Sequence, residues 1–342
     1  MPPDLHLAHT SDTLLFLAVV CYALAMLGYA GEFAFRHRSA GPAANASGAT
    51  ALRGGLADRL GAAGVAATVL GWVAHVGSVT TRGLAVHRVP WGNMYEFSSM
   101  VALIAVTAFL VLLSRQDVRY LGAFLMVPVV TYLGLAGTVL YSAPAPLVPA
   151  LHSYWIKIHV VAAISASGVF MLAGVVTVLF LVKDRWERGG PPLATVLLRG
   201  LGRMVPGGRR SGAVSLGPGT AAAVELGTGG GGGIMLALPS AAVLDRTAYR
   251  IIAFAFPVWT FAIMAGAIWA KAAWGRYWGW DPKETWSFIT WLAYAGYLHA
   301  RATAGWRGRK AAALSLVGFS CLMIDYYAVN VWIVGLHSYA GL

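Results

Sequence analysis

Eight runs of mostly apolar residues, each long enough to cross a lipid bilayer, constrain this chain more than any other feature. They lie near residues 13–35, 59–79, 97–114, 119–141, 158–182, 249–271, 285–301 and 311–334. A transmembrane helix needs roughly 20 apolar residues, and it satisfies its own backbone hydrogen bonds inside the lipid. Only 11% of the residues are charged, against about 25% in a soluble domain. The sequence therefore predicts an all-α integral membrane protein with about eight transmembrane helices.

The positions of the basic residues predict how the chain is oriented. Its formal net charge is +12, but most Lys and Arg residues flank the loops that follow the first, third, fifth and seventh runs. Such loops are cytoplasmic by the positive-inside rule, so the charge reflects topology and not nucleic-acid binding. We expect a multi-pass protein of the cell membrane, in contact with membrane lipid, with both termini extracytoplasmic. Residues 1–12 contain no Lys or Arg, so we expect the first run to be a true span and not a cleaved signal peptide.

On this basis the chain divides into four regions. Residues 1–70 form an N-terminal transmembrane region, and residues 71–182 and 249–342 form the two parts of a membrane core. Residues 183–248, rich in Gly and Arg, predict a flexible cytoplasmic insert. Cys21 and Cys321 both lie inside apolar runs and lack metal-binding or redox spacing.

The stretch "WGRYWGWDPKETW" at 274–286 gathers aromatic and charged residues in one predicted outer loop. Trp and Tyr often form a belt at the membrane surface, but a belt would be spread over all span ends. The crowding of Trp274, Tyr277, Trp278 and Trp280 favours stacking against a large flat ligand. Asp281, followed by a proline, also fits the start of a helix. We therefore expect this loop to bind a ligand and to begin the seventh span.

Histidines on the same side of the membrane complete this candidate site. His159, in "HSYWIKIHV", and His337, in "GLHSYAGL", fall at the outer ends of the fifth and eighth runs. Two imidazoles on opposite faces of a plane are a natural axial pair for haem iron. His152 competes with His159, and the residues alone do not decide between them. His299, near the cytoplasmic end of the seventh run, fits either an interfacial anchor or a second ligand site.

Cations near the aromatic loop agree with an anionic flat ligand. Lys271, Arg276 and Lys283 could pair with carboxylates. A tetrapyrrole with two carboxylates requires aromatic stacking, cations at its edge and axial histidines, and the outer face provides all three.

The stretch "WAKAAWGRYWGWDPKETWSFITWLAYAGYLHAR" resembles the tryptophan-rich WWD signature of cytochrome c assembly proteins of the CcsA/ResC type, which belong to system II. The resemblance continues in "HRVPWGNMYEFSSM", "HSYWIKIHV" and "GLHSYAGL", and it covers most of the chain from about residue 70 onward, apart from the insert. Eight runs in 342 residues favour this type over the shorter delivery proteins and the much longer synthases of system I.

The resemblance implies a role in cytochrome c biogenesis. Haem b, as a bound substrate, would be presented on the extracytoplasmic face for covalent attachment to the C-x-x-C-H motif of apocytochrome c. The resemblance makes His159 and His337 the iron ligands at this position, and His299 a ligand at a second position shared with a ResB/CcsB-type partner. The chain would be a subunit of a holocytochrome c synthase. The side chains that would hold the haem are Asp281 and the four aromatic residues of the same loop: Trp274, Tyr277, Trp278 and Trp280.

Three other functions stay open at this stage. The first is a haem exporter or delivery protein without synthase activity. The second is a membrane electron-transfer protein, which is disfavoured because the candidate histidines gather at the outer side and not at matching depths in facing helices. The third is a solute transporter with a belt of Trp residues, which would bind no haem.

Overall fold

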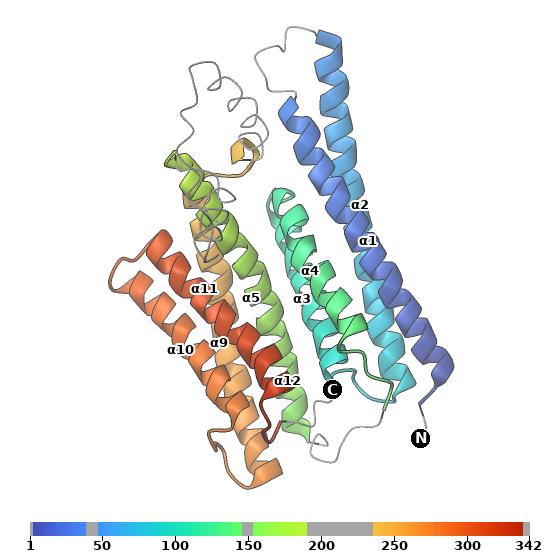
Figure 1. Cartoon of the computed structure of the whole chain (residues 1–342), viewed down its shortest axis with the longest axis vertical. Helices are drawn as coiled ribbons and strands as arrows, with labels where there is room; N and C mark the ends of the chain where they lie inside the picture. Colours follow the sequence, from blue (N-terminus) through green and yellow to red (C-terminus); the bar gives the residue numbers. More distant parts are fainter. Residues whose placement is uncertain (1–2, 39–46, 146–152, 190–234, 338–342) are drawn as a thin grey trace, which may run out of the picture.

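The computed structural model describes residues 3–38, 47–145, 153–189 and 235–337, which form a bundle of helices without a strand (Figure 1). The all-α class predicted from the apolar runs is therefore confirmed. The helices are α1 (Leu5–Arg38), α2 (Ser47–Ala85), α3 (Met94–Arg115), α4 (Tyr120–Thr138), α5 (Tyr154–Glu187), α9 (Ala241–Trp274), α10 (Pro282–Ala302), α11 (Arg309–Met323), the π-helical turn η2 (Ile324–Ala328) and α12 (Val329–Trp332).

Seven helices in the described part of the chain are long and apolar enough to cross a membrane. Helix α10 is not among them, although its 21 residues are about 30 Å long at ~1.5 Å per residue, close to the thickness of the hydrocarbon core. Its sequence is less apolar because it contains Lys283, Glu284 and Arg301. It lies beside α9 and α11 in the bundle (Figure 1). The chain is a multi-pass membrane protein, and the number of eight spans stays a prediction.

Successive long helices run in opposite directions, so their connections alternate between the two ends of the bundle (Figure 1). Helix α1 packs mainly on α2, while α5 packs mainly on α9 and also contacts α3 and α11. The start of α5, the α9–α10 loop and the end of α12 lie at the same end of the bundle (Figure 1). The fold thus brings together three segments that are distant in the sequence.

The two helices that flank the predicted insert at 183–248 extend into its first and last residues. Helix α5 continues to Glu187 and α9 begins at Ala241. Paired charges support the end of α5: Lys183 lies 3.7 Å from Glu187, and Asp184 lies 2.9 Å from Arg188. The carboxylate of Glu187 also accepts a hydrogen bond from Ala241 N at 3.1 Å. Residues 183–187 and 241–248 are therefore helical, whereas residues 190–234 lie outside the described part of the chain.

A buried ion network holds the loop between α2 and α3 near the site. The carboxylate of Glu96 accepts hydrogen bonds from Gly92 N at 2.9 Å, Arg88 Nη1 at 2.7 Å and Arg82 Nε at 3.2 Å. Asn93 caps α3 by accepting a hydrogen bond from Glu96 N at 2.9 Å. A buried charge is costly unless it is paired and hydrogen-bonded. The convergence of these donors on Glu96 therefore fixes the loop in one position.

Candidate functional site

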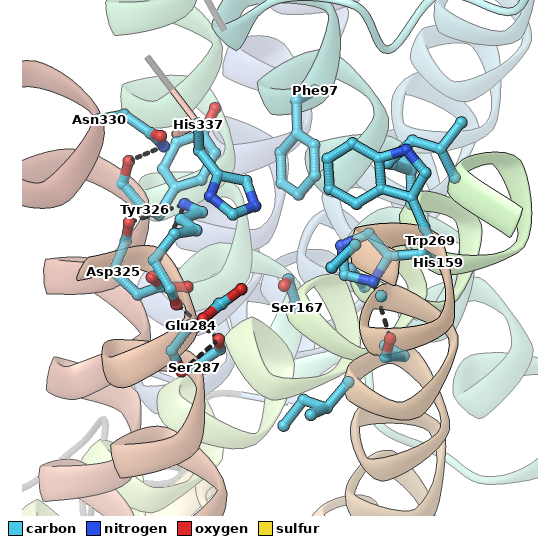
Figure 2. A pocket seen from close by; sticks show the side chains of 18 of the residues that line it. Phe97, His159, Ser167, Trp269, Glu284, Ser287, Asp325, Tyr326, Asn330 and His337 are labelled. Atoms are coloured by element: carbon cyan, nitrogen blue, oxygen red, sulfur yellow. Dashed lines mark hydrogen bonds and ion pairs between the residues drawn. The ribbon is translucent and has the colours of Figure 1, made fainter. Parts of the chain in front are cut away.

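A cavity of about 160 Å³ lies between α3, α5, α9, α10 and the segment after α11 (Figure 2). Aromatic side chains form a large part of its mostly apolar wall, and several polar side chains face it. The aromatic residues include Trp91, Phe97, Tyr132, Trp259, Trp269, Trp274, Tyr277, Trp278 and Tyr326. The polar residues include His159, Ser167, Lys283, Glu284, Asp325, Asn330 and His337. Such a wall suits a large, mostly apolar ligand with a few polar groups.

His159 lies in the second turn of α5 and faces α9. Its Nδ1 lies 2.7 Å from the carbonyl oxygen of Ala262. A carbonyl can only accept, so Nδ1 carries the hydrogen and the lone pair of the neutral ring lies on Nε2. The ring also lies against Gly266, where a Cβ atom would come within 2.7 Å of Nδ1. Helix α9 thus sets both the position and the tautomer of His159.

His337 follows the last helical turn and reaches the cavity from the opposite end of the chain (Figure 2). Its Nδ1 lies 2.8 Å from Oδ2 of Asp281. Burial lowers the pKa of His337 to about 4, despite the opposing effect of the hydrogen bond to Asp281. The imidazole is therefore neutral at neutral pH, which is the form that ligates metals.

The indole of Trp269 contacts both imidazoles (Figure 2). It is stacked on His159 at a centroid distance of 6.4 Å and an interplanar angle of 10°. Its distance to the ring of His337 is 5.8 Å, and it also packs edge-on against Trp274 at 4.7 Å. Trp269 is only 1% exposed. A ligand that binds both histidines must therefore replace contacts that Trp269 now makes.

The aromatic residues of the α9–α10 loop do not all face the cavity. Trp274, Tyr277 and Trp278 line it, whereas Trp280 is 67% exposed and packs edge-on against Trp278 at 5.8 Å. Trp280 also has a positive φ of 57°, which is uncommon for a residue with a large side chain. The backbone conformation thus turns Trp280 away from the cavity that its neighbours line.

Asp281 lies behind the cavity wall as the N-cap of α10. It forms a capping box with Glu284, whose carboxylate accepts hydrogen bonds from Gly279 N at 2.7 Å and Asp281 N at 3.1 Å. Burial alone would raise the pKa of Asp281, but the hydrogen bonds from Leu336 N and His337 lower it below its usual value. Asp281 is therefore an ionised acceptor that joins α10 to the C-terminal segment.

The π-helical turn η2 contributes polar groups that the sequence reasoning missed. Lys283 Nζ donates to the carbonyl oxygen of Asp325 at 2.8 Å and lies 3.8 Å from its Oδ1. The Tyr326 hydroxyl donates to Met94 O at 2.9 Å and is also hydrogen-bonded to Ser98. An acid inside an apolar run is itself a signal of function, and π-helical turns are frequent at functional sites. The first of these signals can be read from the sequence and could have identified Asp325.

The remaining histidines lie away from this cavity or outside the described residues. His299 is exposed near the end of α10 and does not line the cavity. His75 is fully buried and hydrogen-bonded to Tyr22 at 3.3 Å and to Ser99 at 2.9 Å. His87 is exposed in the α2–α3 loop, and His152 lies outside the described residues.

The fold and this geometry define a multi-pass membrane protein with an aromatic, histidine-lined cavity at one end of its helices. Residues 91–337 match the family model described as "Cytochrome C assembly protein". The chain is similar to relatives named "Cytochrome c biogenesis protein CcsA". The relative from Gloeobacter violaceus is 35% identical over 82% of this chain and 86% of its own length. Those from Rippkaea orientalis and Synechococcus elongatus are each 37% identical over 82% of this chain and 87% of their own length. The chain belongs to the cytochrome c assembly protein family.

Proposed function

We propose that this chain acts in cytochrome c biogenesis by holding haem b, as a substrate, at the extracytoplasmic end of the bundle. The chain then helps to attach the haem to the C-x-x-C-H motif of apocytochrome c. One observation carries the proposal: His159 and His337, from distant segments, line one aromatic cavity. Membership of the family and the names of the relatives support the same role.

The side chains around the cavity fit such a substrate. His159 and His337 would hold the iron, and the stacked aromatic wall would contact the faces of the macrocycle. The Lys283 ammonium could pair with a carboxylate at its edge. The present cavity of about 160 Å³ is smaller than the roughly 300–1,000 Å³ of typical ligand pockets. Binding therefore requires side chains to move, first of all Trp269.

The proposed orientation places this end of the bundle outside the cytoplasm, with eight spans and both termini on that side. The opposite end of the bundle contains basic residues, among them Arg185, Arg246, Arg301 and Arg309. Such residues are enriched on the cytoplasmic side of membrane proteins. The cavity would then open toward the side on which apocytochrome c is matured.

Attachment requires each cysteine sulfur to form a bond to a vinyl carbon of haem, while the thiol hydrogen is added to the neighbouring carbon. This addition consumes no oxidant or reductant. The contribution of the chain is proximity and orientation, which can supply a large part of a barrier between two partners. Asp281 and Glu284 are both engaged in the capping box, so we assign neither of them a proton-transfer role.

A second haem position would involve His299 and a ResB/CcsB-type partner. His299 is exposed on α10 together with Phe288 and Leu292, which lie eleven and seven residues earlier and are 38% and 56% exposed. Spacings of 3, 4, 7 and 11 residues place side chains on the same face of a helix. This apolar face with one imidazole suits a partner helix that supplies the other iron ligand.

The alternative is a haem exporter or delivery protein without synthase activity. Alanine variants of Trp274 and Trp278 separate the two functions. If the variants retain haem at the outer position but lose attachment to apocytochrome c, the exporter-only function is contradicted. If attachment persists in proportion to the haem retained, delivery alone is sufficient.

The first experiment is an absorption spectrum of the protein purified in detergent together with its ResB/CcsB-type partner. The wild type is compared with His159→Ala/His337→Ala, and His87→Ala serves as a control at an exposed histidine outside the cavity. Bis-histidine haem bands should be present in the wild type and the control and weakened in the double variant. An unchanged spectrum in the double variant would move the site elsewhere, with His299 tested next. Absence of haem from a haem-replete wild type would contradict the proposed function.

A further inference from the structure

Asp281 makes more contacts than the start of a helix requires. As the N-cap of α10, its Oδ2 accepts a hydrogen bond from Lys283 N at 3.3 Å. The same carboxylate also binds the C-terminal segment: Oδ1 accepts from Leu336 N at 2.7 Å, and Oδ2 accepts from His337 Nδ1 at 2.8 Å. The side chain of Asp281 is only 5% exposed. One buried carboxylate therefore determines where two distant segments meet.

Gly335 permits this close approach. A Cβ atom at residue 335 would lie 2.8 Å from Oδ1 of Asp281, closer than real Cβ contacts allow. The absence of a side chain at this position lets the backbone of the C-terminal segment lie directly on the carboxylate. His337 is therefore held both through its own ring and through the backbone N–H of the preceding residue, Leu336.

These contacts also select the tautomer of His337. An ionised carboxylate can only accept hydrogen bonds, so the hydrogen of the neutral ring must lie on Nδ1 and the lone pair on Nε2. Histidines that ligate metals usually donate their other N–H group to a carboxylate or a carbonyl. His159 has the carbonyl version of this arrangement, through Ala262 O at 2.7 Å.

We infer that Asp281 is a positioning residue, which holds His337 in the Nδ1–H tautomer so that Nε2 is the atom that can ligate the iron of haem. The consequence for haem rests on the proposed function, whereas the tautomer is a property of the ligand-free chain. Asp281 thus acts through His337 and is not itself in the wall of the cavity.

An amide at residue 281 reverses the hydrogen bond to His337. Asp281→Asn leaves one oxygen where the carboxylate has two, and we expect it to stay with Leu336 N, which donates at 2.7 Å, and not with the cap donor Lys283 N, which donates at 3.3 Å. The other half of the capping box, from Asp281 N to Glu284 at 3.1 Å, does not involve the side chain of residue 281. The amide NH₂ would then face His337 Nδ1, and the ring can accept that hydrogen bond only by moving its own hydrogen to Nε2. The variant should therefore hold His337 in the opposite tautomer, with its lone pair directed away from the iron, as Asp→Asn does in the serine protease triad.

The test is ¹⁵N NMR of the ligand-free full-length chain, labelled at histidine and reconstituted in detergent at neutral pH. His337→Gln identifies the resonances of His337. The matched control is Asp184→Asn, the same change at a buried acid that pairs with Arg188 at the other end of the bundle. We expect Nδ1–H at His337 in the wild type and the control, and Nε2–H in Asp281→Asn. Nε2–H in the wild type, or an unchanged tautomer in Asp281→Asn, would overturn the inference.

Haem titration of the same samples gives the second readout. Loss of a hydrogen-bond partner behind a metal ligand typically lowers metal affinity about 10–100-fold, and we expect a decrease of this size for Asp281→Asn relative to Asp184→Asn. Equal haem affinity in the two variants would overturn the inference even if the tautomer changes. If the tautomers are as expected but the wild type binds no haem, the role of Asp281 in setting the tautomer is supported, and it is the proposed function that fails.

Discussion

The imidazole of His159 and the backbone of Gly266 are in direct contact, and a Cβ atom at residue 266 would come within 2.7 Å of Nδ1. The same ring nitrogen donates to Ala262 O, one helical turn earlier in α9. Helix α9 thus provides a backbone surface without a side chain, on which the ring packs, and a hydrogen-bond acceptor beside it. This relationship makes Gly266 a part of the candidate site, although glycine has no side chain.

Gly266→Ala should weaken haem binding by displacing the ring of His159. Alanine is usually favoured over glycine inside a helix by about 1 kcal/mol, so a helix-propensity effect alone would stabilise the protein. We expect instead a decrease in haem affinity of about 10–100-fold, as for other losses of support behind a metal ligand. Gly134→Ala in α4, where a Cβ atom would meet nothing within 4 Å, is the matched control. Haem titrations that do not distinguish the two variants would show that Gly266 does not position His159.

Trp278→Ala should weaken haem binding more than Trp280→Ala. Trp278 lines the cavity, whereas Trp280 is 67% exposed. Stacking between aromatic rings contributes about 0.5–1.5 kcal/mol beyond area burial, so we expect roughly a 2–10-fold larger loss of affinity for Trp278→Ala. Haem dissociation constants of the two purified variants provide the comparison. A larger loss for Trp280→Ala would mean that the loop rearranges on binding.

The ligand-free protein should lose stability as the pH falls from about 6.5 to about 4. The pKa of His337 is lowered to about 4 in the folded chain, against about 6.5 in an unfolded chain. Between these values the unfolded state binds the proton first, so stability falls with falling pH and is unaffected by this group above about 6.5. The neighbouring charged or titratable groups are Asp281, Lys283 and His159.

The midpoint of thermal unfolding in detergent, measured between pH 4 and pH 7 for the wild type and His337→Gln, tests this expectation. The wild-type midpoint should decrease more steeply than that of the variant across this range. Parallel profiles would show that protonation of His337 is not linked to folding.

Lys283→Met should destabilise the chain, because it leaves the buried carboxylate of Asp325 without its cation. The two side chains are 24% and 5% exposed, and Asp325 Oδ1 has no hydrogen-bond partner among the described residues. Removal of one partner of a buried ion pair typically costs about 3–5 kcal/mol. Thermal unfolding of Lys283→Met, Asp325→Asn and the double variant gives the coupling free energy between the two side chains. The double variant should be more stable than Lys283→Met alone, and additive effects would exclude a direct interaction.

Most of the secondary structure could be predicted from the sequence. The apolar runs give the helices because a chain in lipid must satisfy its backbone hydrogen bonds within each segment. Asp281 could be recognised as the start of α10 because capping depends on residues close in sequence. The exact ends of α5 and α9 could not be predicted, because they are held by contacts between distant residues, such as that between Glu187 and Ala241.

The sequence by itself thus determined the membrane class, the helical segments and the grouping of aromatic residues and histidines toward one side. Only the tertiary structure decided which of these groups share a cavity, that Trp280 faces away from it, and that Asp281 and Ala262 select the tautomers of His337 and His159. The reason is physical: helix formation and capping depend on neighbours within a few residues, whereas these contacts join atoms from helices and segments far apart in the chain. Their positions follow from how the helices pack.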